Sequence, residues 1–153
     1  MECVMADNIR IYELCEARPQ YLPAINALLV QLSSNPRPFG MKELEAIVDS
    51  PATHLFILEC DGVVAGMLTL GDYLAPTGRK MWIEDVVVDC AFRGRSLGRA
   101  LVEHAMEYAT SLDRGSLMLT SRPSRVAANA LYRSCGFEQR DTNVYRMTVD
   151  GCK

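Results

Sequence analysis

The sequence predicts an α/β fold in which a mixed β-sheet carries helices on both faces. Two observations support this prediction: apolar residues recur at strand spacing in several short segments and at helical spacing in others. These segments follow one another in the order strand, two helices, three strands, helix, strand, helix and two strands, which is typical of a layered α/β domain. The chain has 153 residues, of which 49% are hydrophobic and 23% charged, and this size and balance predict a single domain over residues 1–153.

Each element has its own local signal. The strand over residues 8–15 alternates apolar and polar side chains, and the helix over residues 97–112 carries an apolar stripe that includes His104. Asp61-Gly62 separates two β-rich runs and predicts a tight antiparallel hairpin, and the loop over residues 33–40 is a candidate substrate flap. The expected strands are residues 8–15, 54–60, 63–70, 80–89, 116–120, 137–140 and 143–149, and the expected helices are residues 21–32, 41–48, 97–112 and 124–135.

Composition excludes several classes of function. The formal charge of −3 and the pI near 5.4 disfavour nonspecific binding to nucleic acid or to an anionic membrane. No apolar run reaches the roughly 18 residues of a membrane span, and the N-terminus lacks the pattern of a signal peptide, so we expect a cytoplasmic protein. The six cysteines are scattered and His54 and His104 have no neighbouring ligands, so we expect no metal site and no disulfide framework.

Small residues and arginines gather between the strand that ends at Asp89 and the helix that begins near Leu97. A glycine-containing turn that opens a helix directs backbone N–H groups at one point and stabilises an anion there, and pyrophosphate fits such a turn. Arg93, Arg95 and Arg99 add positive charge, although each could equally be a solvated residue at a helix start. The sequence of this segment matches neither the P-loop motif nor the fingerprint of dinucleotide-binding folds.

Two blocks of sequence resemble the GNAT superfamily of N-acyltransferases. Arg95-Ser96-Leu97-Gly98-Arg99-Ala100 resembles the acyl-CoA signature of that family, and residues 129–137, Asn-Ala-Leu-Tyr-Arg-Ser-Cys-Gly-Phe, resemble a later family block. The resemblance implies a mixed, mostly antiparallel central sheet with helices on both faces, and acetyl-CoA as the co-substrate. It covers nearly the whole chain and is weakest over residues 18–50.

The resemblance also implies which residues hold the cofactor. The backbone of the central strand pairs with the pantetheine arm and can polarise the thioester carbonyl. Asn129 would bind the cofactor arm and Tyr132, three residues later on the same helix face, would protonate the leaving thiolate. The structural alternatives are that Asn129 is a polar residue on the helix surface and that Tyr132 is an aromatic core residue. The implied cofactor-binding residues are Val86, Val87, Val88, Arg93, Gly94, Arg95, Ser96, Leu97, Gly98, Arg99, Ala100, Asn129 and Tyr132.

Two further positions carry expectations of their own. Many family members have glycine where this chain has Ser96, so we expect either that the turn avoids positive φ or that the Ser96 hydroxyl caps the helix. Glu84 and Asp85 are candidate catalytic residues, and adjacent strand residues should face opposite sides of the sheet, so one of them should reach the cleft. The alternative is a buried carboxylate bonded to backbone or to arginine. Residues 83–89 resemble the corresponding strand of glucosamine-6-phosphate N-acetyltransferases.

The sequence therefore predicts an N-acetyltransferase that transfers the acetyl group of acetyl-CoA to a primary amine by direct attack in a ternary complex. The expected partner is a small-molecule or peptide amine, with no nucleic acid and no membrane, and a homodimer is allowed. A noncatalytic acyl-CoA sensor and a partner-binding domain are the alternatives. Cys135 has no histidine near it in sequence, so we do not expect a covalent acyl-enzyme.

Overall fold

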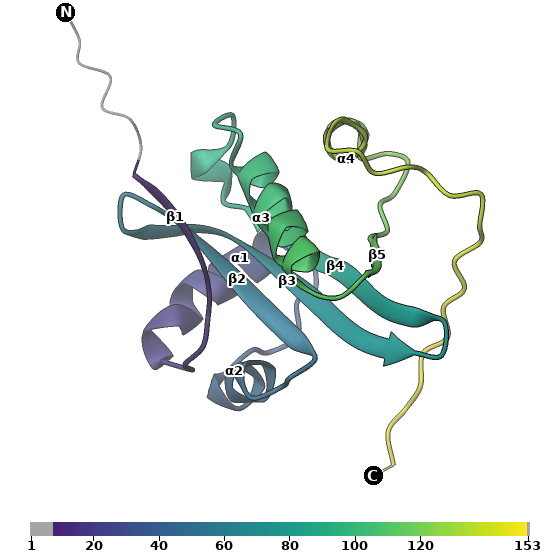
Figure 1. Cartoon of the computed structure of the whole chain (residues 1–153). Coiled ribbons are helices and arrows are strands. Elements are labelled where there is room, and N and C mark those ends of the chain that lie inside the picture. Colours follow the sequence, from purple (N-terminus) through teal and green to yellow (C-terminus); the bar gives the residue numbers. More distant parts are fainter. Residues whose placement is uncertain (1–7, 153) are drawn as a thin grey trace, which may run out of the picture. The chain divides into compact units, whose positions relative to one another are not determined.

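The computed structural model describes residues 8–152 and divides them into two units, one ending at Thr120 and the other beginning at Ser121 (Figure 1). The single domain expected from the sequence stays a prediction. The first unit contains β1 (Ile9–Glu13), the 3-10 turn η1 (Pro19–Tyr21), α1 (Leu22–Leu32), α2 (Met41–Val48), β2 (Thr53–Cys60), β3 (Val63–Ala75), β4 (Gly78–Val88), the 3-10 turn η2 (Cys90–Phe92), α3 (Leu97–Ser111) and β5 (Gly115–Met118). The second unit contains α4 (Val126–Ser134).

The five strands of the first unit form one sheet in the order β1-β2-β3-β4-β5. β1 to β4 pair antiparallel, and β5 joins β4 in parallel. A parallel neighbour requires a crossover connection, and α3 lies in the connection between β4 and β5. The predicted mixed, mostly antiparallel sheet is therefore confirmed.

The hairpin between β2 and β3 forms where the Asp-Gly pair predicts it. Asp61 has φ 51° and Gly62 has φ 80°, the two positive values that a tight two-residue hairpin turn requires. The Asp61 carboxylate also accepts a hydrogen bond from the backbone N–H of Asn8 at 3.0 Å. The turn therefore connects β2 to β3 and also holds the residue that precedes β1.

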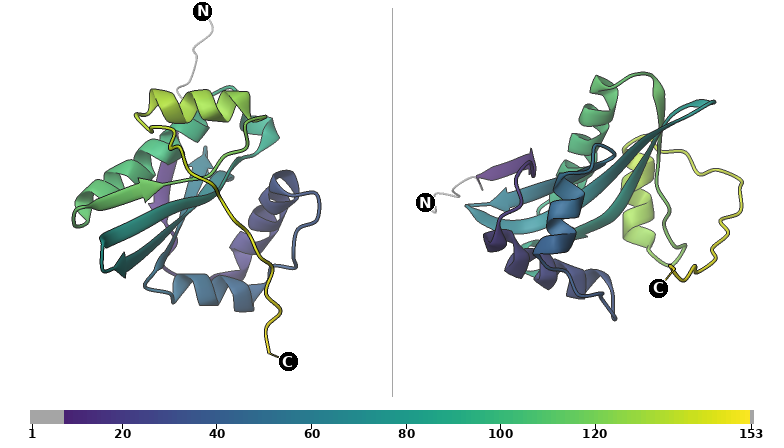
Figure 2. Two further views of the ribbon diagram at one scale, coloured as in Figure 1. Left: turned by 90° about the vertical axis from the view of Figure 1, so that its right-hand side faces the viewer. Right: turned by 90° about the horizontal axis from the view of Figure 1, so that it is seen from below.

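Successive residues of β2 are buried on opposite faces of the sheet. Leu55 and Ile57 belong to the core beneath α1 and α2, whereas the ring of Phe56 lies 5.0 Å from that of His104 on α3. Helices therefore cover both faces, as predicted, with α1 and α2 on one and α3 on the other (Figure 2). The core beneath α1 and α2 contains Leu14, Ile25, Leu28, Leu44, Leu55, Ile57, Met67 and Val87.

A glycine in β3 allows α3 to lie close to the sheet. A Cβ atom on Gly66 would lie 2.9 Å from the carbonyl oxygen of Val87 and 3.2 Å from Cδ1 of Leu101. The first distance is shorter than side chains tolerate, so the contact between β3, β4 and α3 depends on glycine at this position.

The parallel contact between β4 and β5 is tight where it begins. Arg79 pairs with Gly115, and a Cβ atom on Gly115 would lie 2.7 Å from the Arg79 carbonyl oxygen. The Arg79 guanidinium donates to both carboxylate oxygens of Asp72 at 2.6 Å and reaches Asp113 at 3.5 Å. Because the Arg79 and Asp72 side chains are only 18% and 10% exposed, little water screens this ion pair, and it ties the β3–β4 hairpin to the loop before β5.

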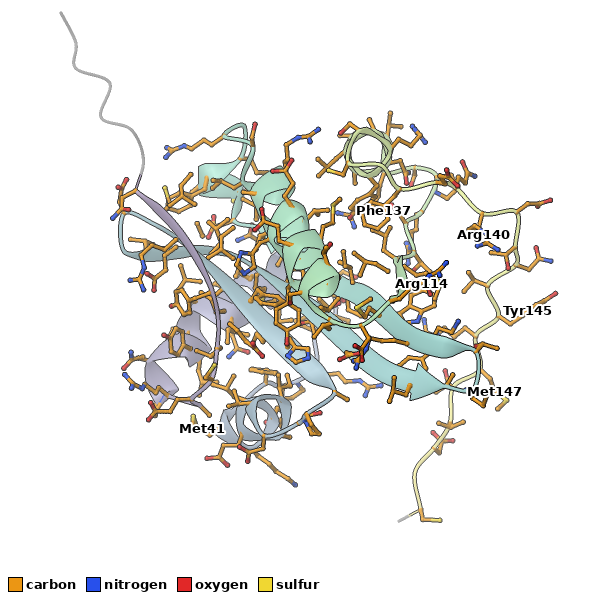
Figure 3. All side chains as sticks on the ribbon, viewed as in Figure 1. Met41, Arg114, Phe137, Arg140, Tyr145 and Met147 are labelled. Carbon is orange, nitrogen blue, oxygen red and sulfur yellow. The ribbon has the colours of Figure 1, made fainter. Side chains whose placement is uncertain are left out.

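The second unit corrects two predictions. The strands predicted over residues 137–140 and 143–149 are wrong, because neither segment is paired in a ladder. Alternating residues favour a strand, but a strand also needs a neighbour for its backbone groups, and none of the described strands pairs with these segments. Tyr145 and Met147 are 89% and 81% exposed and project from the segment in Figure 3.

The helix of the second unit ends as predicted. Gly136 has φ 98°, and the backbone N–H of Phe137 donates to the Tyr132 carbonyl at 3.0 Å, which satisfies carbonyls of the last helical turn. No helix within residues 8–152 is long and apolar enough to cross a membrane.

Candidate active site

β4 has an open edge over its last residues. The parallel pairing with β5 stops at Trp82 and Met118, whereas β4 continues to Val88. Six residues of β4 therefore extend past the last pair with β5, and backbone N–H and C=O groups on that side are available to an extended ligand. Val86, Val87 and Val88, the strand residues predicted to pair with pantetheine, lie in this segment.

A β-bulge interrupts β4 within the same segment. Met67 pairs with Val87 and Thr69 with Glu84, so the single residue between the β3 partners lies opposite two residues of β4. Asp85 is one of these two and has φ 50°, the left-handed conformation of a bulge residue. The bulge bends β4 within the segment that extends past its last pair with β5.

The bulge also changes which face each residue of β4 occupies. Ile83 lies opposite Leu70, whereas Val87 lies opposite Met67 in the core beneath α1 and α2. Asp85 and Val86 together lie opposite Leu68, so regular alternation breaks between Asp85 and Val86, and the expectation that Glu84 and Asp85 face opposite sides stays a prediction. Both side chains are exposed, and neither is hydrogen-bonded or ion-paired within the described residues, so the buried-carboxylate alternative is wrong.

The Glu84 carboxyl has a raised pKa. Partial desolvation raises the pKa of the Glu84 carboxyl above its usual range, and the neighbouring Asp85 carboxylate raises it further. A carboxylate with a raised pKa is a stronger base than an ordinary glutamate. The exposed position and the raised pKa make Glu84 a candidate for accepting a proton.

The turn that follows β4 is held by several hydrogen bonds. Asp89 accepts from the backbone N–H of Ala91 at 2.9 Å, and its own N–H donates to the Ala65 carbonyl at 2.7 Å. The N–H of Cys90 donates to Oε1 of Gln31 at 2.8 Å, so α1 contacts the turn directly. Nothing in the sequence pattern pointed to Gln31, because a glutamine near the end of an amphipathic helix has no local signal for a contact 59 residues away.

The predicted anion-binding turn leads directly into α3. Gly94 has φ 81° and Ser96 has φ 58° and ψ 24°, and the Ser96 carbonyl accepts the first helical hydrogen bond from Ala100 at 3.1 Å. The first N–H groups of this 15-residue helix have no carbonyl partner one turn earlier in the helix, and such a helix start is a favourable environment for phosphate. Leu97 is buried and anchors the helix start.

Ser96 contradicts both alternatives raised by the sequence. Its backbone occupies the left-handed region after all, and its hydroxyl makes no capping hydrogen bond. Left-handed backbone costs a non-glycine residue about 1–2 kcal/mol, so this turn stores strain. The conformation that glycine adopts freely is thus retained here by a serine.

The arginines of the turn have contacts of their own. The Arg95 guanidinium lies 5.5 Å from the centre of the Phe92 ring, and Arg99 donates to Glu103 at 3.0 Å. Arg93 reaches the Val88 carbonyl at 3.4 Å. Arg93 and Arg95 thus lie in the turn, and Arg99 lies in the first turn of α3.

In the second unit, α4 carries Asn129 and Tyr132 one turn apart. The Asn129 amide donates to the Arg122 carbonyl at 2.9 Å and holds the loop before the helix. Tyr132 is only 9% exposed and its ring meets Phe137 edge-to-face at 6.1 Å. Burial raises the pKa of the Tyr132 phenol above 10, opposed by the charge of Arg125, so the phenol keeps its proton at neutral pH.

The remaining histidines have structural contacts. His104 is half-buried and packs against Phe56, as expected for a core or boundary residue. His54 lies 2.7 Å from Glu13 through Nδ1 and 3.2 Å from the Tyr108 hydroxyl. Within residues 8–152, no group of three or more His, Cys, Asp or Glu side chains is placed to hold a metal ion.

The open edge of β4 and the glycine-containing turn at the start of α3 are together typical of acyl-CoA-dependent acetyltransferases. Residues 22–137 match the model of the acetyltransferase (GNAT) family. The chain therefore belongs to this family and is an acyl-CoA-dependent N-acetyltransferase, as the sequence predicted.

Individual relatives agree with this assignment. Glucosamine 6-phosphate N-acetyltransferase 1 of Oryza sativa is 26% identical over 145 residues, covering 91% of this chain and 86% of the relative. The solved structure of glucosamine-6-phosphate N-acetyltransferase from Arabidopsis thaliana superposes with a TM-score of 0.76 at 24% identity, covering 92% of this chain and 98% of that one. The [ribosomal protein bS18]-alanine N-acetyltransferase of Escherichia coli is 37% identical over 68 residues, which are 44% of this chain and 46% of that protein.

Proposed function

We propose that the protein transfers the acetyl group of acetyl-CoA to a primary amine by direct attack in a ternary complex. The observation that carries this proposal is the open edge of β4 next to the turn over residues 93–99. The pantetheine arm would pair with the backbone of Val86 to Val88, and the pyrophosphate would lie at the start of α3. The positive charges of Arg93, Arg95 and Arg99 would favour it there.

The chemistry requires two proton transfers. A neutral amine attacks the thioester carbonyl and forms the C–N bond, and a backbone N–H of β4 stabilises the oxyanion. The C–S bond then breaks, and the thiolate takes a proton from the Tyr132 phenol. Glu84 accepts the proton that the amine loses, directly or through water, and solvent restores the phenol. No covalent enzyme intermediate is required.

The acceptor would be a cationic amine. Glu84 and Asp85 are both exposed at the open end of β4 and would attract an ammonium group before it loses its proton. The relatives act on different acceptors, an amino sugar phosphate in the plant enzymes and a protein alanine in the bacterial one. We propose a small-molecule or peptide amine in the cytoplasm, where thiols such as Cys15 and Cys90 stay reduced.

Donor binding is tested by calorimetry and thermal melting. Saturating acetyl-CoA should raise the melting temperature, because a ligand of the folded state stabilises it by mass action. Gly98→Val should abolish the shift by placing a branched side chain beside the pyrophosphate, and the melting temperature of the free variant separates lost binding from misfolding. A wild-type protein with neither heat nor thermal shift would contradict the proposal.

The acid role of Tyr132 is tested by substitution. Tyr132→Phe should keep donor affinity but lower kcat by about 10²-fold, because the leaving thiolate loses its proton donor. Tyr145→Phe is the matched control, since Tyr145 is 89% exposed in the same unit. Amines, amino sugars and peptides would be screened by thiol release and product mass. Unchanged kcat in Tyr132→Phe, with chemistry limiting turnover, would assign this tyrosine to packing.

A further inference from the structure

One hydrogen bond connects α1 with the turn that precedes the donor-binding loop. Oε1 of Gln31 accepts from the backbone N–H of Cys90 at 2.8 Å, across 59 positions of sequence. Gln31 is the penultimate residue of α1, and Cys90 opens η2. The bond therefore joins the segment before the 33–38 loop with the segment before residues 93–99.

The 33–38 loop is fixed at both ends and exposed between them. Leu32 and Phe39 pack against the core beneath α1 and α2. The Asn26 amide donates to the Phe39 carbonyl at 3.0 Å and to the Leu22 carbonyl at 2.9 Å, which holds the far end of the loop against α1. Residues 33–38 themselves are all exposed. A small movement at the end of α1 is therefore transmitted to a short, tethered loop.

The turn on the other side of the bond is equally well held. The Asp89 carboxylate bonds Ala91, and the Arg93 guanidinium reaches the Val88 carbonyl at 3.4 Å. Arg93 and the N–H groups that follow it are the groups to which a pyrophosphate would bind. A ligand that draws this loop toward itself therefore pulls on Cys90, and through Cys90 on Gln31.

We propose that Gln31 is a positioning residue that couples the 33–38 loop to the donor loop, so that CoA binding orders the loop. The proposal rests on the proposed function, because it takes CoA as the ligand of residues 93–99. Coupling is reciprocal, so ordering of the 33–38 loop by an acceptor would also tighten donor binding.

The experiment is hydrogen–deuterium exchange with and without CoA, read at the amides of Ser33 to Asn35 and Arg37. Three variants are compared with the wild type. Gln31→Leu removes the acceptor oxygen at similar size, Gln31→Glu keeps an oxygen acceptor, and Gln20→Leu is the matched control at an exposed glutamine. CoA affinity is measured calorimetrically on the same samples.

CoA should slow exchange in the 33–38 loop of the wild type, the Gln31→Glu variant and the Gln20→Leu variant. In Gln31→Leu the slowing should disappear and CoA should bind about fivefold more weakly, as expected for the loss of one hydrogen bond. Equal slowing in Gln31→Leu and wild type overturns the coupling, as does CoA binding that leaves loop exchange unchanged in every protein. Failure of CoA to bind the wild type at all would instead refute the proposed function.

Discussion

The left-handed serine at the start of α3 leads to a quantitative prediction. Ser96→Gly removes a strain of about 1–2 kcal/mol, because glycine adopts positive φ without a clash. Against this, glycine loses more backbone entropy on folding, about 0.5–1 kcal/mol. The Ser96 hydroxyl makes no capping bond that could be lost. The variant should therefore be more stable than the wild type by about 0.5–1 kcal/mol.

Urea denaturation followed by circular dichroism measures this difference directly. For a domain of this size, the expected gain corresponds to a rise in melting temperature of about 1–4 °C. Ser34→Gly is the matched control: Ser34 is an exposed loop serine without positive φ, so the same substitution relieves no strain and should lower stability slightly. Ser96→Ala keeps the strain and should lie close to the wild type.

The reasoning fails if Ser96→Gly is no more stable than Ser34→Gly. That result would mean that the left-handed backbone at residue 96 carries no strain. A gain of the same size in Ser96→Ala would trace the effect to the hydroxyl instead of the backbone. Donor affinity should survive Ser96→Gly, because the backbone keeps the conformation that presents its N–H groups.

Three further outcomes follow from the geometry. Gly66→Ala should destabilise the protein by about 1–3 kcal/mol in urea, because its Cβ would lie 2.9 Å from the Val87 carbonyl oxygen. Gly71→Ala is the control, with its nearest atom at 3.9 Å, and an equal loss in both would contradict the packing argument. Because partial desolvation raises the pKa of Glu84 and the Asp85 charge raises it further, Asp85→Asn should move the acid limb of kcat/KM to lower pH. Glu84→Gln should remove that limb, and an unmoved limb in both variants would show that another group titrates.

Most of the fold could be predicted because its signals are local. The Asp61-Gly62 pair predicts a two-residue hairpin turn, and both residues have the positive φ that such a turn needs. The helix over 41–48 was predicted at the bounds it has, and Gly136 ends α4 as expected. Each of these features is fixed by a few adjacent residues.

The features that escaped prediction depend on distant partners or on unusual residues. No glycine marks the bulge at Asp85, so the sequence pattern predicts a regular strand and misses the break in alternation after Asp85. The residues around Tyr145 have the alternation of a strand. Alternation is a property of one segment, however, and a strand also needs a second segment to pair with. Ser96 adopts a conformation that its type disfavours, which only the backbone geometry can show.

The tight contact between Arg79 and Gly115 gives the open-edged end of β4 the mechanics of a lever. The pivot is the short parallel pairing that ends at Trp82, and from there β4 continues to Val88 paired with β3 alone, about 20 Å at the rise of an extended strand. Over that length a rotation of about 3° displaces the tip by about 1 Å. Acyl transfer tolerates little misplacement of the reacting atoms, so a bulkier residue at position 115, remote from any bound cofactor, would act at the thioester.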